Sequence, residues 1–78
     1  MSQRDNIGFA LWLLRSTRRL TQDELAARIP ATTREQVSDW EIGAKLPTVA
    51  SFERVCRGLE VSPRACLRIA ESRGKKAA

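Results

Sequence analysis

The sequence predicts an all-α domain built from five helices. No stretch alternates apolar and polar side chains among β-branched residues, as a half-buried strand requires. Apolar residues recur instead at spacings of three and four, which is the repeat of an amphipathic helix. Helix-capping residues divide the chain into five helical segments. With 78 residues, 42% of them hydrophobic, the chain can form one compact helical core.

The first helix is expected from about Gln3 to Arg18. Ile7, Leu11 and Leu14 recur at helical spacing and form its inward stripe. The apolar residues outside this stripe are Phe9, Trp12 and Leu13. Trp12 is expected to extend the core, whereas any of the three that stays exposed would mark a contact surface.

The second helix is expected to begin after Thr21. Thr21 and Glu24 have the spacing of a capping box, in which each side chain bonds to the backbone amide of the other residue. Leu20 and Leu25 stand at the positions of a hydrophobic staple across this cap. The helix should end at the residue before Pro30, because that residue is biased away from the helical region.

The third helix has two candidate starts. Thr32 with Glu35, or Thr33 with Gln36, offers a second capping box, and both remain open at this point. Gly43 is a natural left-handed terminator at its other end. Its inward residues are Val37 and Trp40, and Trp40 is expected to be the largest contributor to the core.

The fourth helix is expected after Pro47-Thr48, and the fifth after Ser62-Pro63, where proline suits the first helical position. Both carry an apolar stripe that must pack on the other helices, because short helices are unstable alone. The expected inward residues of the fourth helix are Val49, Phe52, Val55, Cys56 and Leu59, and the apolar residues of the fifth are Val61, Cys66, Leu67 and Ile69.

Charge and reactive residues narrow the classes of function. Fourteen Lys and Arg against nine Asp and Glu give a net charge of +5, which favours a polyanion such as nucleic acid, or an anionic membrane surface. With no histidine and two cysteines, Cys56 and Cys66, we expect no metal site and no cofactor. Both cysteines are expected to be buried free thiols that serve as packing residues in a reducing cytoplasm.

The longest apolar run, Ile7 to Leu14, is too short to span a bilayer. The sequence also shows no nucleophile–base arrangement that would indicate an enzyme.

A set of short motifs runs in order along the chain. It consists of Ile7-Gly8, Leu11, Leu14-Arg15, Leu20 to Ala26, Val37, Trp40 to Gly43, Pro47, and Phe52 to Ser62. Together these motifs resemble the lambda-repressor-like family of helix-turn-helix DNA-binding domains, of the Cro/CI or XRE-like type. The resemblance extends from Ile7 to about Leu67. It implies that the second and third helices form the helix-turn-helix, with the third, the recognition helix, in the major groove.

The resemblance implies a set of base-reading residues. By position they are Gln22, Arg34, Glu35, Gln36, Ser38 and Asp39. Arg34 has the fork geometry that reads guanine O6 and N7, and Gln22 can hold adenine or a phosphate. Glu35 and Asp39 can accept from cytosine N4, while Ser38 can donate or accept.

The resemblance also implies contacts to DNA phosphates, which fix the register of the protein on the duplex. The phosphate candidates are Arg15, Arg18, Arg19, Thr21 with the Gln22 backbone, Thr33 and Lys45. In the family, the arginine at Arg15 pairs with the glutamate at Glu41, so we also expect a structural ion pair between the first and third helices.

Two features depart from the family pattern. The turn Pro30-Ala31-Thr32-Thr33 is one residue longer than usual, so the recognition helix is displaced or rotated and each groove assignment can shift by one position. The recognition helix also carries two acids, Glu35 and Asp39. These could read cytosine, be held by Arg34 or Arg28, or act against binding to wrong sites.

The family forms dimers through the loop after the recognition helix and the last two helices. Carried over to this chain, the dimer contacts are Leu46, Arg57, Arg64, Leu67 and Arg68, with Ile69 nearby. Ile42 and Leu46 fit either the rim of the core or a dimer contact. We expect one DNA-binding domain over residues 1–72, which includes the dimerisation surface, and a basic, disordered tail over residues 73–78.

The sequence therefore predicts a small sequence-specific DNA-binding regulator of transcription, a repressor-like homodimer that binds a palindromic operator. It would act in the cytoplasm on the nucleoid, with no membrane attachment. The alternative is an antitoxin or adaptor module, in which the third helix or the first-helix surface binds a toxin or another protein partner.

Overall fold

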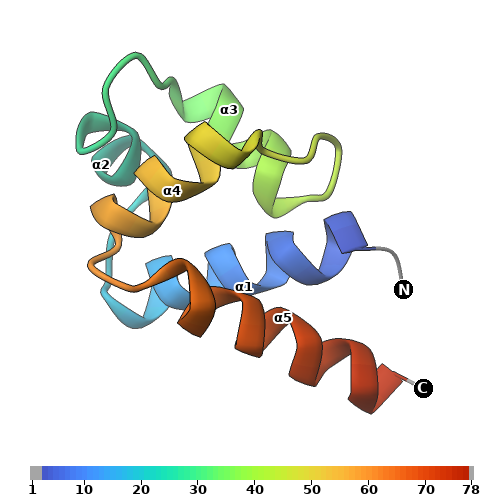
Figure 1. Ribbon diagram of the computed structural model, residues 1–78. Coiled ribbons are helices and arrows are strands. Elements are labelled where there is room, and N and C mark those ends of the chain that lie inside the picture. Colours follow the sequence, from blue (N-terminus) through green and yellow to red (C-terminus); the bar gives the residue numbers. More distant parts are fainter. Residues whose placement is uncertain (1–2, 78) are drawn as a thin grey trace.

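The computed structural model describes residues 3–77, and these residues form five α-helices and no β-strand (Figure 1). The helices are α1 (Gln3–Thr17), α2 (Gln22–Ala27), α3 (Arg34–Glu41), α4 (Val49–Gly58) and α5 (Pro63–Ala77). The predicted all-α class is thereby confirmed. Figure 1 shows α1 and α5 side by side along one side of the molecule, and α2, α3 and α4 grouped above them.

The core lies between these two groups of helices. α1 packs most extensively against α5 and then against α3. Burial of each large apolar side chain stabilises the fold by about 1.5–3 kcal/mol relative to leaving it in water. The large side chains buried most completely are Leu11, Leu25, Val37, Val55, Cys56, Leu59 and Cys66, and Trp40 is buried beside them.

The start of α3 is set by Thr33 rather than Thr32. The Thr33 hydroxyl accepts from the Gln36 amide at 3.2 Å, and the Gln36 side-chain oxygen accepts from the Thr33 amide at 3.0 Å. The Thr32 hydroxyl donates instead to the carbonyl of Pro30, at 3.1 Å. This reciprocal pair makes Arg34 the first helical residue of α3.

Three of the helices end in the same backbone motif. In each, an amide beyond the helix bonds to a carbonyl five residues earlier, with a left-handed residue between them. The bonds run from Leu20 N to Arg15 O (3.2 Å), from Ala44 N to Asp39 O (2.9 Å) and from Val61 N to Cys56 O (3.0 Å). The left-handed residues are Arg19, Gly43 and Glu60, with φ of 56°, 80° and 59°. Two of the three are therefore side-chain-bearing residues at a position that favours glycine.

α1 crosses the end of α3 at Gly8. A Cβ atom at this position would collide with the Trp40 carbonyl oxygen and would lie 2.6 Å from the Glu41 carbonyl oxygen. Both oxygens belong to the backbone and cannot rotate away. Glycine therefore permits the close approach that sets α1 against the C-terminal end of α3.

Two expected core residues lie at the surface. The expectation that Trp12 thickens the core is wrong, because its side chain is 45% exposed. The inward placement of Val49 is also wrong, since it is 76% exposed. Val49 is the first residue of α4, directly after the N-cap Thr48, whereas the buried residues of this helix, Val55 and Cys56, lie in its second half. Phe52 and Leu14 are partly buried against the core.

Two helix boundaries also differ from expectation. α2 ends at Ala27, with Arg28 as its C-cap, so the helix stops before Ile29. α5 continues to Ala77, so the backbone of residues 73–77 is helical where a disordered tail was expected, and residue 78 of that tail lies outside the described residues. The Lys, Arg and Ala residues of this segment favour a helix, and a single interior glycine costs only about 1 kcal/mol.

Candidate nucleic-acid interface

A single buried carboxylate, that of Glu41, joins α3 to α1 and α2. Arg15 donates to it twice, from Nε to Oε2 at 2.6 Å and from Nη2 to Oε1 at 2.9 Å. The Gln22 Nε2 atom donates to the same Oε1 at 3.1 Å. The Arg15 and Glu41 side chains are only 14% and 4% exposed, so this ion pair is shielded from water. The network fixes how α3 is oriented relative to the first two helices.

Arg15 belongs to this internal network rather than to the DNA-facing surface. Its Nη1 atom donates to the carbonyl of Leu20 at 2.8 Å, so all three guanidinium nitrogens donate within the domain. The hydrogen bond to Glu41 raises the pKa of Arg15 above its ordinary value, although burial works in the opposite direction. Its expected phosphate contact is therefore not supported, and the structure gives it the role of a structural cation.

Five of the six expected base-reading residues line one depression of about 310 Å³ on the α2–α3 face. They are Gln22, Arg34, Glu35, Ser38 and Asp39. The four from α3 are spaced so that they share one face of that helix. The side-chain amide of Gln22 is held in place by Glu41, and nothing in the sequence indicated this contact. The side-chain oxygen of the sixth residue, Gln36, is engaged in the α3 capping box.

The acidic residues of this face are balanced differently from expectation. Lys45 Nζ lies 3.7 Å from Asp39 Oδ2, so the loop after α3, rather than Arg34 or Arg28, supplies the cation for Asp39. Arg28 lies instead 3.7 Å from Glu60. The Lys45 side chain is 74% exposed, so this pair is weak and the ammonium can turn outward to another anion.

The backbone at the start of α2 offers fewer donors than expected. The Thr21 amide donates to Glu24 Oε1 at 2.8 Å, within the predicted capping box, which is confirmed. This bond from Thr21 lowers the pKa of the Glu24 carboxyl. The first bond inside α2 runs from Leu25 N to Thr21 O, so the Gln22 amide precedes the helical bonding pattern. Gln22 is thus the remaining backbone donor of the two that were expected.

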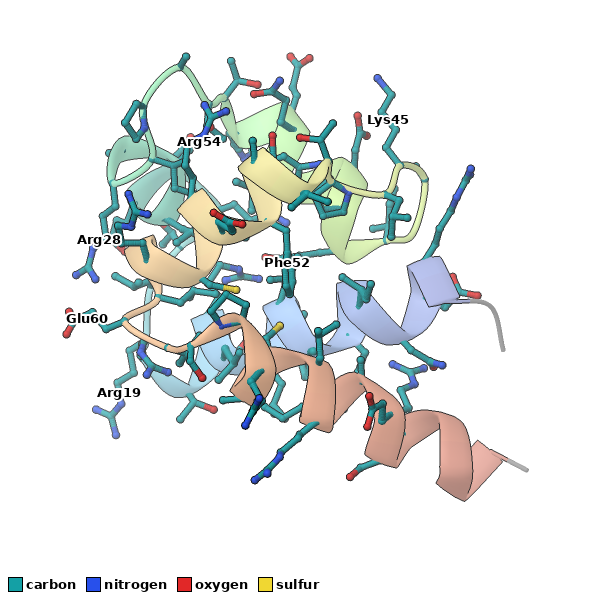
Figure 2. All side chains as sticks on the ribbon, viewed as in Figure 1. Arg19, Arg28, Lys45, Phe52, Arg54 and Glu60 are labelled. Carbon is teal, nitrogen blue, oxygen red and sulfur yellow. The ribbon has the colours of Figure 1, made fainter. Side chains whose placement is uncertain are left out.

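The other phosphate candidates lie at different ends of the molecule. Thr33, the exposed N-cap of α3, and Lys45, in the loop after α3, both flank the recognition helix. Arg18 and Arg19 lie at the end of α1, with Arg18 partly buried and Arg19 exposed. Figure 2 shows Arg19 at the opposite end of the molecule from Lys45. The structure therefore groups only part of the expected phosphate set with α3.

The expected dimer residues do not form one patch. Leu46 and Leu67 line a single groove of about 350 Å³ together with Val49 and Phe52. Val49 was expected to be inward, and its position in the first turn of α4 was the sequence feature that could have indicated its exposure. Arg64, exposed at the start of α5, follows Pro63, which lines the same groove. The other two arginines lie elsewhere. Arg57 lines a depression beside Arg28, and Arg68 lines a pocket between α1 and α5.

The two cysteines lie in the core. Cys56 of α4 and Cys66 of α5 are buried free thiols. Hydrogen bonding to Cys56, together with burial, raises the pKa of Cys66. Among the described residues there is no group of three or more His, Cys, Asp or Glu side chains arranged to hold a metal ion. Within the same part of the chain, every helix is too short or too polar to cross a membrane.

Comparison with known proteins places these features in a family. A helix-turn-helix family model matches residues 14–65, which is more than half of the chain. Two crystal structures of the clp gene regulator ClgR from Corynebacterium glutamicum are similar to it, each 26% identical in sequence. The match covers 92% of this chain in both cases, with 92% of one ClgR chain at a TM-score of 0.86 and 76% of the other at 0.87. No curated protein sequence matches the chain.

The matched residues include the capped start of α2, the whole of α3 and the ion pair between Arg15 and Glu41. The high TM-scores show that the fold of this chain agrees with the similar structures over nearly its entire length. The chain therefore belongs to the XRE, or lambda-repressor-like, family of helix-turn-helix domains.

Proposed function

We propose that this protein is a sequence-specific DNA-binding regulator of transcription, with α3 in the major groove. The observation that carries the proposal is the depression on the α2–α3 face, where Arg34 and Gln22 lie next to Ser38 and two carboxylates. These side chains present both donors and acceptors, as reading base edges requires. The net charge of +5 supports binding to a polyanion, and the similarity to ClgR, a gene regulator, supports a role in transcription. It would act in the cytoplasm, on the nucleoid, and not as an enzyme.

The DNA-binding test compares two variants in a salt titration. Arg34→Ala should relax specificity at one base position, because the guanidinium that reads that base is lost, at a cost of about 1–3 kcal/mol for the preferred base. Lys45→Ala should weaken binding to all sequences about equally and flatten the salt slope by about one, because it removes a phosphate contact.

Arg73→Ala is the matched control for this titration. It removes one positive charge from α5, on the other side of the molecule from α3, and should leave the salt slope unchanged. The duplexes should include the DNA that flanks the protein's own gene. If no duplex binds in a salt-dependent manner, the proposal is wrong.

We further propose that the protein acts as a homodimer on a palindromic operator, with half-sites about one helical turn apart. The groove lined by Leu46, Val49 and Leu67 supports this, because it exposes apolar side chains at the start of α4 and α5. Val49→Asp should convert the dimer to a monomer without unfolding it, since Val49 is 76% exposed. Sedimentation with and without operator DNA measures this, and a wild-type monomer on the operator would refute the dimer.

A second candidate function is an adaptor or antitoxin-like module that binds a protein. The exposure of Trp12 favours it, because large exposed aromatic side chains are enriched in protein contacts. Trp12-dependent binding of a protein, by a chain that shows no salt-dependent DNA binding, would favour this candidate over the regulator.

A further inference from the structure

An aromatic and basic surface covers part of α1 and α5, away from the α2–α3 face. We name it the Trp12 surface, and it consists of Phe9, Trp12, Leu13, Arg68, Ile69 and Arg73. The Trp12 and Phe9 rings are in contact, with centroids 5.9 Å apart. Phe9, Leu13 and Ile69 line a pocket of about 380 Å³ between the two helices. Trp12, at 45% exposure, stands beside this pocket as a large uncovered aromatic side chain.

The polar part of the Trp12 surface is positively charged. The Arg73 guanidinium carbon lies 4.2 Å from the centre of the Phe9 ring, which is a stacked cation–π contact. Arg68 lines the same pocket, and none of its described lining residues carries a carboxylate. A stacked guanidinium keeps its N–H edges available and loses less freedom on binding, so Arg73 is already oriented to meet a carboxylate.

We propose that the Trp12 surface binds an acidic amphipathic segment of another protein. An apolar side chain of that segment enters the pocket against Phe9 and Leu13, and Trp12 packs along it. Carboxylates that flank the apolar side chain pair with Arg68 and Arg73 in bidentate geometry. Trp and Arg, two of the residue types in this surface, are among those that dominate binding energy in such contacts.

The charge of the surface selects this occupant over two others. A second copy of the chain, packed through a two-fold axis, would bring Arg68 and Arg73 of both copies together without a carboxylate from the lining. A nucleic-acid backbone would pair with the arginines but has no group to fill an apolar pocket. The residues of the Trp12 surface come from α1 and α5, whereas the DNA-facing depression is formed by α2 and α3. Both can therefore be occupied at once, and the inference holds whether or not α3 reads DNA.

A peptide selection tests the proposal and does not require the partner to be identified first. The probe is a phage-displayed library of random linear peptides, selected on the intact folded protein after removal of peptides that bind Trp12→Ala. The selected peptides should share an apolar residue flanked by Asp or Glu. Peptides rich in Lys or Arg, or the absence of any that depend on Trp12, would overturn the proposal.

Binding of a selected peptide is then measured by fluorescence polarisation. Trp12→Ala and Arg73→Glu should each weaken it at least about tenfold, which corresponds to about 1.4 kcal/mol. The matched control is Arg54→Glu, which makes the same charge change on α4, outside the pocket lining, and should leave the affinity unchanged. If Arg54→Glu weakens binding as much as Arg73→Glu, only net charge is recognised and the proposal fails.

Two further measurements separate folding and DNA binding from this result. Circular dichroism should show that the variants remain folded, and Trp12→Ala should bind duplex DNA as the wild type does. Sedimentation provides the last check. Self-association of the wild type that is abolished by Trp12→Ala would assign the surface to a second copy and overturn the proposal.

Discussion

At the scale of single residues, Glu41 fixes how α3 is held against α1 and α2. Its two carboxylate oxygens accept from Arg15 of α1 and Gln22 of α2, while its backbone ends α3. Burying two charges is costly, and the cost is offset only while both partners stay paired. Removal of one partner should therefore be far more harmful than replacement of both.

Glu41→Ala is expected to lower the free energy of unfolding by about 3–5 kcal/mol, because it leaves the Arg15 guanidinium buried and unpaired. Urea denaturation followed by circular dichroism measures this. The double variant Arg15→Met with Glu41→Leu should be more stable than the sum of the two single changes predicts, since no charge remains in the interior. A loss below about 1 kcal/mol for Glu41→Ala would mean that the pair behaves like an exposed salt bridge.

Gly8→Ala is expected to destabilise the protein by about 1–3 kcal/mol, because a methyl group at this position collides with two backbone carbonyls at the end of α3. The matched control is Ser16→Ala, an exposed position on the same helix, which should change stability by no more than about 0.5 kcal/mol. Thermal unfolding of both variants compares them directly. Equal melting temperatures would contradict the close approach of α1 to α3.

At the scale of helices, the ends of α1 and α4 each hold a side-chain-bearing residue in the left-handed region. Replacement by glycine removes the Cβ contact that makes this conformation costly, about 1 kcal/mol per residue. Glu60→Gly at the end of α4 should therefore raise the free energy of unfolding by about 0.5–1 kcal/mol. This figure already allows for the small loss of the exposed ion pair with Arg28.

The control for this change is the same substitution inside the same helix. Glu53→Gly should lower stability by about 1 kcal/mol, because glycine in a helix interior adds freedom to the unfolded chain. Chemical denaturation should thus give opposite signs for the two glycine variants of α4. Two destabilised variants would contradict the left-handed conformation of Glu60.

The capping box of α2 should make stability depend on acid. The bond from the Thr21 amide lowers the folded-state pKa of Glu24 below its ordinary 4.5. The stabilisation is therefore fully present above pH 4.5 and is lost as the pH falls through the lower, folded-state pKa. Glu24→Gln should remove part of this acid dependence in unfolding curves recorded between about pH 5 and pH 2. Glu71→Gln, on the exposed surface of α5, should keep it.

The helix starts were predictable because their causes are local. A capping box joins residues three apart, so the start after Thr21 follows from the sequence alone. The start of α3 was narrowed to two residues for the same reason. The sequence could not decide between Thr32 and Thr33 as the N-cap, because the outcome depends on how the Thr32 hydroxyl bonds back to the turn at Pro30.

At the scale of the whole molecule, the two thiols report on complete unfolding. Cys56 and Cys66 have no exposed surface, and burial with mutual hydrogen bonding raises the pKa of Cys66. Labelling by a disulfide reagent should therefore require opening of the contact between α4 and α5. Its rate should rise with urea in parallel with global unfolding, and Glu41→Ala should accelerate it. Fast labelling of the native protein, at the rate of the denatured control, would contradict this.

The features of the site that the sequence did not predict depend on contacts between residues far apart in the sequence. Gln22 and Glu41 are 19 positions apart, and nothing in their local sequence indicates that they meet. The exposure of Trp12 depends on which faces of α1 are covered by α3 and α5, and helical spacing does not determine how helices cross. The family resemblance correctly predicted the ion pair between Arg15 and Glu41, which helical spacing alone would not have indicated.

The inward and outward residues of α3 have separate roles, and this separation affects how the sequence of the protein can evolve. Val37, Trp40 and Glu41 hold the helix to the domain, whereas Arg34, Glu35 and Ser38 face outward into the depression. Substitutions at the outward positions leave the interior contacts intact, so they can accumulate with little loss of stability. Under the proposed function, duplicated copies of such a gene can therefore acquire new DNA targets by a few changes in one helix, while the scaffold that presents that helix stays the same.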